Sequence, residues 1–397
     1  MKTENRVWVS ATEAIEMLGV SRATLYAYVS RGRIRSEATA GKTRNRRYSR
    51  DDIERMRART DERRNPEKAA EHALHWGLPI LESAITLIAE GHIYYRGRDA
   101  AELARTSSLA EVAALLWTGS ADGGAQLATA AKPSATKGRD ADAPFVARAQ
   151  ATLALAAAKD PLGYDLRPRT VVQTGWRILQ ALATVAANGS ARESTIDATL
   201  AKAWGVPGAA PLLRAALILC ADHELNVSTF TARCVASAGA SPYGVVIAGL
   251  AALEGVKHGG TTGRIEASWD SLRRTRDLRG ALAERLRRGE RMDGFGHPLY
   301  AGGDPRATVL LAMLPKSRSA AYARELTATI AAVLGEPPNV DFALVAFAKA
   351  LGLPNGTALT VFALGRAMGW IGHAIEQYGH DAIIRPRAKY VGEKPLQ

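Results

Sequence analysis

The pattern of hydrophobic and polar positions indicates a protein made mainly of helices. Residues 169–187, 211–223 and 241–255 carry apolar side chains at helical spacing and are too apolar for surface helices. We therefore expect them to be buried helices of one large α-helical body. The clearest β pattern lies at residues 84–97, where two β-rich runs flank Glu90-Gly91 and predict a hairpin.

The first 60 residues carry the pattern of two short helices joined by a tight turn. Ser10 and Glu13 have the spacing of a capping box, which predicts that a helix begins after Ser10. Gly19 ends this helix, and Ser21 caps a second one that runs to about residue 31. Two helices connected in this way are typical of a helix-turn-helix module.

A basic stretch follows the second helix and leads into the rest of the chain. Residues 33–49, with Gly41 at the turn, predict a two-stranded wing, and Ser49 caps a third helix. Residues 61–75 are polar and charged, which predicts a linker. The expected organisation is therefore a winged helix-turn-helix module over 1–60, this linker, and one helical body over 76–397.

Composition and charge refine this division. The chain has 397 residues, of which 47% are hydrophobic and 6% aromatic, enough for a large core of α-rich type. The formal net charge is +13, and residues 1–68 hold 17 Lys and Arg against 10 Asp and Glu. A basic module ahead of a less charged body is typical of a protein that meets a polyanion. Residues 119–143 are rich in Gly, Ala, Ser and Asp and predict a mobile surface insertion.

The chain carries few signals of a secreted or membrane protein. Its two cysteines, Cys220 and Cys234, lie in apolar helical stretches, which favours core thiols in a reducing compartment. The first residues have no apolar signal core, and no run of about 18 apolar residues is present. We expect a cytoplasmic protein that does not span a membrane.

Three of the eight histidines lie beside glycines and oxygen-bearing side chains. They are His223 in ADHELNVSTF, His258 in VKHGGTT and His297 in GFGHPLY. A zinc site is disfavoured because Val227 stands where an H-E-x-x-H motif would have its second histidine, and no Cys-x-x-Cys is present. No G-x-S-x-G motif supports a serine hydrolase. We therefore expect that these histidines bind no metal and that they belong to another kind of site.

The N-terminal segment resembles the winged helix-turn-helix of the MerR and excisionase families, in the order LGVSRATLY, then V-x-x-G-x-I, then R-R-Y-S-x-x-D-I. The resemblance implies that helix 21–31 enters the major groove of DNA while the wing touches the backbone. The alternative is that the module only packs against the body or another subunit. The implied DNA-contacting residues are Arg22, Thr24, Tyr26, Arg44, Arg46 and Arg47.

Six short sequence blocks in the body resemble the citrate synthase family and follow one another in the family's order. The resemblance covers residues 76–392 and implies a large all-helical body with a small helical subdomain. It also implies condensation of an acyl-CoA with oxaloacetate, without a permanently bound cofactor. The blocks are DHELN-x-STF (222–230), HGG (258–260), GFGH-x-x-Y…DPRA (294–307), NVDF (339–342), FALGRAMGWIGHAIEQ (362–377) and IRPRAKYVG (384–392).

The resemblance implies a catalytic trio whose roles match the chemical need. A carbon nucleophile forms when a carboxylate base removes a proton next to the thioester while a donor holds the thioester oxygen. Asp341 would be this base and His258 the neutral donor, placed near a helix start where the dipole disfavours imidazolium. His297 would donate to the ketone oxygen of the oxo acid, and hydrolysis of the thioester would then release CoA.

The resemblance also implies how the substrates are held. Carboxylates favour arginine, and the matching positions are Arg306, Arg366 and Arg385, with His223 beside them. The family's arginine at the position of Arg385 reaches the other subunit's site, so a homodimer is implied. The basic side chains at Lys257 and Arg291 are the candidates for the CoA phosphates.

Some positions depart from the family pattern and leave alternatives open. Pro298 follows His297, Thr261-Thr262 follow HGG, and Ala343-Leu344 follow NVDF. These departures leave both acetyl-CoA and propionyl-CoA, and so citrate and 2-methylcitrate, as possible choices. A DNA-binding regulator that uses the body as a CoA or citrate sensor is the alternative function. A lyase acting in the reverse direction would use the same residues.

Overall fold

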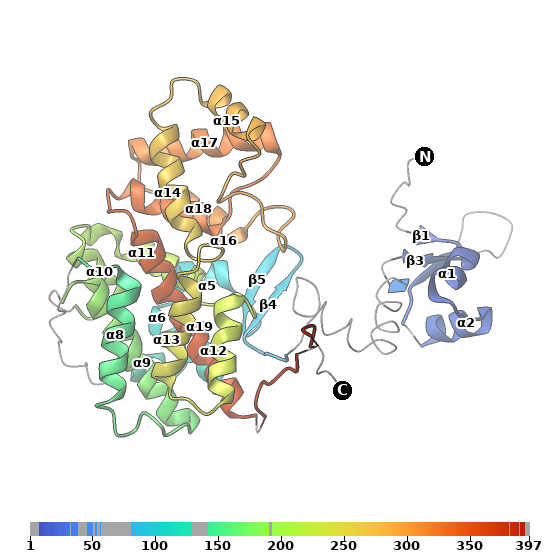
Figure 1. The fold of residues 1–397 in the computed structure, drawn as a ribbon, viewed down its shortest axis with the longest axis horizontal. Coiled ribbons are helices and arrows are strands. Elements are labelled where there is room, and N and C mark those ends of the chain that lie inside the picture. The colour runs from blue at the N-terminus through green and yellow to red at the C-terminus, as the bar shows by residue number, and fades with distance from the viewer. Residues whose placement is uncertain are drawn as a thin grey trace. The chain divides into compact units, whose positions relative to one another are not determined.

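The computed structural model of the chain describes residues 8–31, 33–38, 46–50, 52–53, 56, 81–128, 142–189, 193–380, 382–388 and 390–393. They belong to two compact units, residues 1–82 and 83–397 (Figure 1). Each unit has its own hydrophobic core. The predicted linker over 61–75 and the wing turn at Gly41 lie outside the described residues.

The first unit contains the two predicted helices with the predicted caps. The Ser10 hydroxyl accepts from the Glu13 amide in a full capping box, and Gly19 ends the helix in the left-handed region. Ser21 accepts from the Thr24 amide and begins the second helix. The elements are β1 (Trp8–Val9), α1 (Ala11–Leu18), α2 (Arg22–Ser30), β2 (Ser36–Ala38) and β3 (Arg46–Ser49).

The sheet of this unit has one strand more than the sequence predicted. β2 and β3 pair antiparallel as the expected wing, but β1 also pairs with β3, with Trp8 opposite Ser49 and Val9 opposite Tyr48. A strand of two residues is too short to show an alternating pattern, so no sequence signal marked it. Leu25 and Tyr48 are buried in the core that this sheet forms with the helices.

The second unit begins with the predicted hairpin and continues almost entirely in helices. The hairpin strands β4 (Thr86–Ala89) and β5 (His92–Tyr95) are joined through Glu90 and Gly91, both in the left-handed region as a type I′ turn requires. A short strand, β6 (Arg98–Asp99), pairs with β5. The helices are α5 (Ala100–Thr106), α6 (Leu109–Thr118), α7 (Gly124–Ala128), α8 (Phe145–Ala157), α9 (Pro168–Ala186), α10 (Ile196–Ala203), η1 (Pro207–Ala209), α11 (Ala210–Leu219), α12 (Val227–Ser237), α13 (Pro242–Leu253), α14 (Thr261–Leu272), α15 (Leu278–Arg287), α16 (Pro305–Ala312), α17 (Arg318–Leu334), α18 (Val340–Ala350) and α19 (Thr357–Tyr378).

Helix α19 is the centre of the second unit. It packs against α6, α9, α11, α12, α13 and α18. It is long and apolar enough to cross a membrane, but 89% of its most apolar window is buried inside the protein, as in a core helix. The predicted buried helices are confirmed as α9, α11 and α13, which contribute side chains to the same core.

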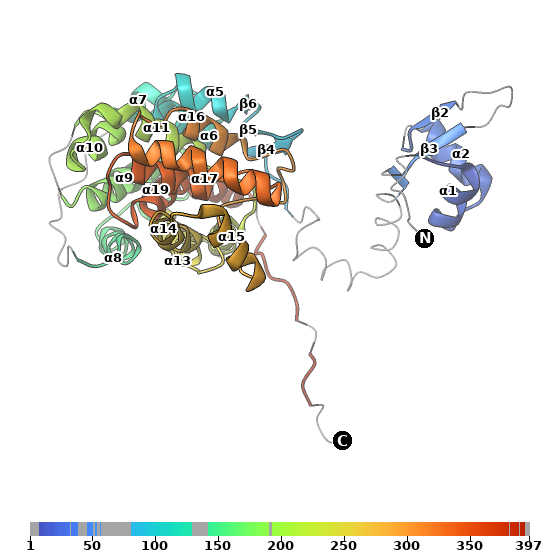
Figure 2. The same cartoon turned by 90° about the horizontal axis from the view of Figure 1, so that it is seen from above.

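The helices of the second unit form two groups. α18 packs against α14, α16 and α17, and α15 packs against α17, so these five helices make a smaller lobe (Figures 1 and 2). The remaining helices form the larger lobe around α19. In the predicted insertion over 119–143, residues Gly124–Ala128 form α7, and residues 129–141 lie outside the described part of the chain.

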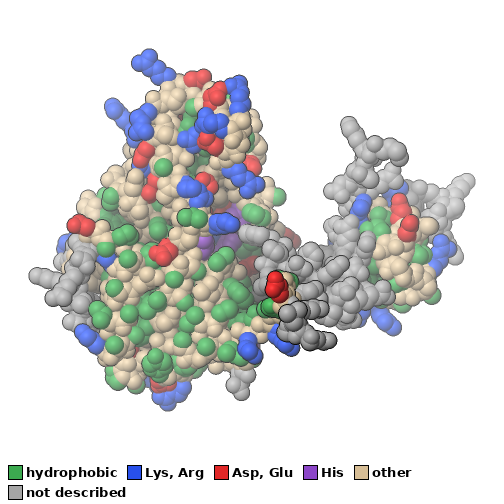
Figure 3. Space-filling view, viewed as in Figure 1, with side chains coloured by type: hydrophobic (Ala, Val, Ile, Leu, Met, Phe, Trp, Pro, Cys, Tyr) green, Lys and Arg blue, Asp and Glu red, His purple; other side chains and the backbone are tan. Residues whose placement is uncertain are grey.

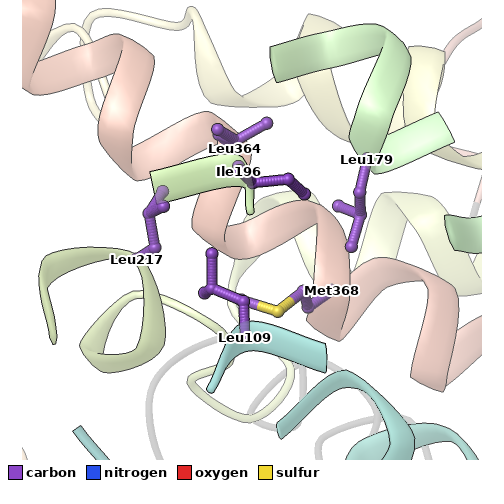
Figure 4. A pocket seen from close by; sticks show the side chains of 6 residues that line it. All are labelled: Leu109, Leu179, Ile196, Leu217, Leu364 and Met368. Carbon is purple, nitrogen blue, oxygen red and sulfur yellow. The ribbon is translucent and has the colours of Figure 1, made fainter. Parts of the chain in front are cut away.

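A small apolar cavity lies inside the larger lobe (Figure 4). The side chains that line it come from α6, α9, α10, α11 and α19, and none of them carries a polar group that could act in catalysis. They are Leu109, Leu179, Ile196, Leu217, Leu364 and Met368. This cavity is a packing gap in the core, and the candidate chemistry lies elsewhere.

Candidate active site

Most of the candidate residues lie in loops or in the first turns of helices in the two lobes. Histidine side chains reach the surface below the lobe of α15 and α17 (Figure 3). His223 lies between α11 and α12, His258 before α14, His297 between α15 and α16, Arg306 and Asp341 in the first turns of α16 and α18, and Arg366 within α19.

The first cluster joins two of the predicted histidines through a tyrosine. The Nε2 atom of His223 lies 2.9 Å from the Tyr300 hydroxyl. The rings of His223 and His297 are 5.2 Å apart, and those of His297 and Tyr300 are 4.9 Å apart. The Arg306 guanidinium lies 5.6 Å from the centre of the Tyr300 ring. His223, His297 and Arg306 are therefore close enough to contact one small ligand.

Arg306 is held in place by an almost fully buried ion pair. Asp304 caps α16 and accepts from Nε and Nη2 of Arg306 at 2.9 and 2.8 Å. The same carboxylate accepts from the Val340 amide at the start of α18. Within the described residues Nη1 of Arg306 has no hydrogen bond, so one edge of the guanidinium is left for a ligand. The pair ties the first turns of α16 and α18 together.

The second cluster surrounds His258. Its Nε2 atom lies 2.9 Å from the Ser228 hydroxyl, which is 2.8 Å from Oδ1 of Asn226. Its ring meets Phe362 edge to face at 5.9 Å, and the Arg366 guanidinium lies 4.7 Å from the centre of the Phe362 ring. Nη1 of Arg366 is buried without a hydrogen-bond partner in the described part of the chain. An anionic ligand would satisfy this atom.

Asn339 joins the His297 loop to the helix that carries Asp341. Its side-chain oxygen accepts from the Asp341 amide as the cap of α18, and its side-chain nitrogen donates to the Gly296 carbonyl at 3.1 Å. The Gly296 amide in turn donates to the Pro337 carbonyl. Gly294 and Gly296 both have positive φ angles, and a Cβ on Gly294 would lie 2.9 Å from neighbouring side chains. Glycine is therefore required for this close approach.

Asp341 has the electrostatics of a carboxylate base. Burial raises the pKa of Asp341 to about 6, and Asp304 adds to this rise. The positive charges of Arg306 and Arg366 oppose the rise. The side chain is therefore largely ionised at neutral pH but binds a proton more readily than an exposed aspartate.

The three histidines are held in the neutral state. Burial, together with the charge of Arg366, lowers the pKa of His258 to about 4. Burial and the charge of Arg306 lower the pKa of His297 to about 4 as well. The pKa of His223 lies well below its usual value for the same reasons. The low pKa of His258 is therefore due mainly to burial and not to the helix dipole that the sequence predicted.

The other predicted substrate contacts are exposed side chains that make no hydrogen bond to these clusters in the described part of the chain. Arg385 is exposed on the C-terminal segment, which leaves the helical body after α19 (Figure 2). Lys257 and Arg291 are exposed, and neither has a hydrogen bond or ion pair within the described residues. In the first unit, Arg44 lies outside the described residues. Arg22, Tyr26, Arg46 and Arg47 are exposed, and Thr24 is half-buried with its hydroxyl 2.9 Å from that of Ser21.

Sequence reasoning did not single out Tyr300, Ser228 and Asn339. All three stand inside the blocks that carried the resemblance, and this position was the only available signal. Their roles depend on contacts between segments far apart in the chain, which no local pattern reveals. In the described part of the chain, no group of three or more His, Cys, Asp or Glu side chains is arranged to hold a metal ion.

Comparison with known proteins finds two matched regions. Residues 73–387 match the family described as "Citrate synthase, C-terminal domain", and residues 8–61 match the family described as "Helix-turn-helix domain". A solved citrate synthase structure from Pyrobaculum aerophilum superposes with a TM-score of 0.72 at 25% identity, over 82% of this chain and 93% of that chain.

Two curated relatives share part of the sequence. A "Citrate synthase" of Haloferax volcanii is 37% identical over 195 residues, which is 46% of this chain and 50% of the relative. A "2-methylcitrate synthase" of Shewanella oneidensis is 33% identical over 187 residues, 45% of this chain and 50% of the relative. The chain thus spans about half the length of the curated relatives that it matches.

Proposed function

The chain belongs to the citrate synthase family, and from this premise we propose that it condenses an acyl-CoA with oxaloacetate and releases free CoA. Acetyl-CoA would give citrate and propionyl-CoA would give 2-methylcitrate. One observation supports the proposal: the same two buried arginines, Arg306 and Arg366, act electrostatically on a carboxylate whose pKa is raised to about 6, Asp341, and on the two neutral histidines His258 and His297. Acid–base condensation requires this set of groups.

In the first step Asp341 removes a proton from the carbon next to the thioester. His258 donates from Nδ1 to the thioester oxygen, which stabilises the charge that forms there. This role requires the Ser228 hydroxyl to donate its single proton to Nε2 of His258, at 2.9 Å, rather than to Asn226, at 2.8 Å. Ser228 then fixes the tautomer of His258 that can act as a donor.

In the second step the carbon nucleophile attacks the ketone carbon of the oxo acid. The Leu299 amide donates to Nδ1 of His297 at 3.2 Å, so the proton of the neutral ring is on Nε2. His297 can therefore donate from Nε2 to the ketone oxygen as it becomes an alkoxide. Water then cleaves the thioester bond, which gives the carboxylic acid and the CoA thiol.

The oxo acid would be bound by the buried cations beside His223. Arg306 bonds to Asp304 through Nε and Nη2 and leaves Nη1 for a ligand, and Nη1 of Arg366 is buried without a partner among the described residues, so a dicarboxylate would satisfy both. Arg385 would complete the site from the other subunit. The exposed Lys257 and Arg291 remain our candidates for the CoA phosphates.

A homodimer is part of the proposal. Leu155 on α8 and Val227 at the start of α12 are 61% and 64% exposed, and both helices pack against α13. Hydrophobic side chains cover much of the face formed by α8, α12 and α13 (Figure 3). A large exposed apolar face marks an interaction surface, and a two-fold dimer would cover it with its own copy. We place this enzyme in the cytoplasm, because both cysteines are free thiols.

Release of CoA thiol tests the proposed reaction. The full-length protein is mixed with oxaloacetate and with acetyl-CoA or propionyl-CoA in parallel, and free thiol is followed over time. The ratio of the two kcat/KM values identifies the acyl group. A folded protein that releases no thiol from either thioester would contradict the proposal and favour a CoA or citrate sensor.

The proposal also predicts how kcat/KM depends on pH, which the same assay measures. The base must be ionised, so kcat/KM should fall about tenfold per pH unit below the Asp341 pKa of about 6. His258 and His297, with pKa values of about 4, stay neutral over this range and add no second step. A profile that is flat between pH 5 and pH 7 would exclude Asp341 as the base.

A second candidate function, DNA binding, is supported by the first unit. Its capped helix α2 carries the exposed Arg22 and Tyr26, and its strand β3 carries the exposed Arg46 and Arg47. Phosphate contacts release counterions, so affinity should fall steeply with salt concentration. A regulator would use this unit to bind DNA whether or not the body turns over substrate.

We expect the variant with both Arg46→Ala and Arg47→Ala to bind DNA more weakly. Because two phosphate contacts are lost, the negative slope of log affinity against log salt concentration should become less steep by about 2. Mobility shifts at several salt concentrations measure the slope. Arg279→Ala, which removes an exposed arginine of the second unit, is the control and should leave it unchanged. No binding by the wild-type protein at low salt would exclude the DNA-binding function.

A further inference from the structure

The loop that carries His223 is held by one face of the central helix. Arg366 donates from Nε to the Cys220 carbonyl at 2.9 Å, and the Gly369 amide donates to the Ala221 carbonyl at 2.9 Å. One turn further along α19, Nε2 of His373 lies 3.3 Å from the Asp222 carboxylate. Positions 366, 369 and 373 share a face of the helix, so they hold three successive residues of the loop.

Asp222 is a buried carboxylate that needs these partners. It is 0% exposed, and it accepts from the Thr86 hydroxyl at 2.6 Å as well as facing His373. Burial alone would raise the pKa of Asp222, but His373, Arg366 and Thr86 together hold it below its usual value. An ionised carboxylate therefore stands directly before His223 in the chain. Without its partners it would be a buried unpaired charge, which is costly.

The backbone just after His223 is in an unusual conformation. Glu224 has a φ angle of 51°, in the left-handed region that non-glycine residues rarely adopt. Such a conformation costs about 1–3 kcal/mol and persists only when its surroundings enforce it. The ring of His223 bonds to Tyr300, and the carboxylate of Asp222 is held by His373 and Thr86. The two residues that precede Glu224 are thus both fixed by contacts with distant parts of the chain.

We propose that His373 is a positioning residue for the oxo-acid site: through Asp222 it holds the His223 loop in the shape that binds the substrate carboxylates. His373 is fully buried behind Asp222, so it acts through the loop and not on the substrate itself. This inference rests on the proposed function, because it assigns His223 to the oxo acid.

The far side of His373 faces a carboxylate that is bonded to the beginning of the second unit. Nδ1 of His373 has no hydrogen-bond partner among the described residues and lies 3.7 Å from Glu376, one turn further along α19. Glu376 accepts from the Ser83 hydroxyl and from the Ala84 amide, both at 2.8 Å, and faces the guanidinium of Arg233. His373 therefore lies between the buried Asp222 and a partly buried carboxylate that Ser83, Ala84 and Arg233 hold in place. This is the property that a positioning residue needs.

A comparison of two substitutions tests the role of His373. His373→Leu keeps the volume but removes both ring nitrogens, whereas His373→Gln places an amide donor near Asp222. We expect His373→Leu to raise the KM for oxaloacetate by about tenfold or more, since small displacements of a binding group are costly. The KM for the acyl-CoA should change by less than about threefold. His373→Gln should restore most of the affinity for oxaloacetate.

A second variant covers the case in which His373→Leu does not fold. Thr86→Val is nearly isosteric, removes the other hydrogen bond to Asp222, and should raise the KM for oxaloacetate severalfold with the acyl-CoA KM unchanged. Equal changes in both KM values, or none in either, would overturn the inference.

Direct calorimetric binding of oxaloacetate to the full-length wild-type protein separates the two possible failures. If the wild type binds oxaloacetate and both variants bind it equally well, only the role of His373 is wrong. If the wild type neither binds oxaloacetate nor releases CoA thiol, the proposed function fails, and the inference fails with it.

Discussion

Asp341→Asn should reduce kcat by at least about 10³-fold while the protein remains folded, because the variant keeps the shape of the side chain but has no basic oxygen. Thiol release at saturating substrate measures this loss. Oxaloacetate binding, which depends on His223 and the arginines, should be nearly unchanged. A variant that retained a tenth of the wild-type rate would exclude Asp341 as the base.

The same substitution should make the protein more stable at neutral pH. Burial raises the pKa of Asp341 to about 6 from the ordinary 3.8, so the folded state binds the proton more tightly than the unfolded state. The free energy of unfolding therefore falls as the pH rises from about 4 to about 6. At pH 7 the ionised side chain costs up to about 3 kcal/mol.

Part of this cost is offset by the position of Asp341. A negative charge in the first turn of α18 interacts favourably with the helix dipole, by about 0.3–1 kcal/mol. We therefore expect Asp341→Asn to raise the free energy of unfolding by about 1–2 kcal/mol in denaturant titrations at pH 7, and to have no such effect at pH 4. Asp270→Asn is the matched control with the opposite sign, because Lys349 lowers the pKa of Asp270. A decrease in stability for Asp341→Asn at pH 7 would contradict this argument.

Such a gain would identify Asp341 as a residue kept for function at the expense of stability. Arg366 is also a residue kept at the expense of stability, because its buried Nη1 has no partner among the described residues. Core residues such as Phe342, next to Asp341 in the same helix, satisfy only packing. A substitution at such a site residue should raise the free energy of unfolding, whereas a substitution at a core residue should lower it. This difference in sign distinguishes the site from the core.

Local sequence signals predicted the features that depend on neighbours in the chain. The caps at Ser10 and Ser21 and the turn at Glu90-Gly91 each follow from residues within four positions of one another, and all three are confirmed. The resemblance supplied candidates such as His223 and Arg366 by their place in a block. What it could not supply was the set of contacts between blocks.

The contacts that the sequence left out join distant segments. Tyr300 meets His223 across 77 positions, and His373 meets Asp222 across 151. No periodicity or spacing encodes such pairs, because they depend on how α19 and the segment before α16 pack against the loop before α12. The two-residue strand β1 was too short to show an alternating pattern, and it is defined only by its pairing with β3, about 40 residues later. Tertiary packing, rather than local propensity, decided each of these features.

Gly369→Ala should show how much of the site depends on this packing. A Cβ at Gly369 would lie 2.4 Å from the Ala221 carbonyl oxygen and 2.5 Å from Oδ1 of Asp222, so either the helix or the loop must move. Overpacking of this kind costs about 1–3 kcal/mol of unfolding free energy. Because the displaced loop carries His223, turnover with oxaloacetate should also fall by about tenfold or more.

A second glycine provides the control for this substitution. Gly263 lies in helix α14, and a Cβ there would meet no atom within 4 Å. Gly263→Ala should therefore stabilise the protein by about 0.4–1 kcal/mol, because alanine restricts the unfolded chain without straining the helix. Denaturant titration of both variants gives the contrast. If the two substitutions shifted the unfolding midpoint in the same direction, the close approach of α19 to the His223 loop would not be what fixes that loop.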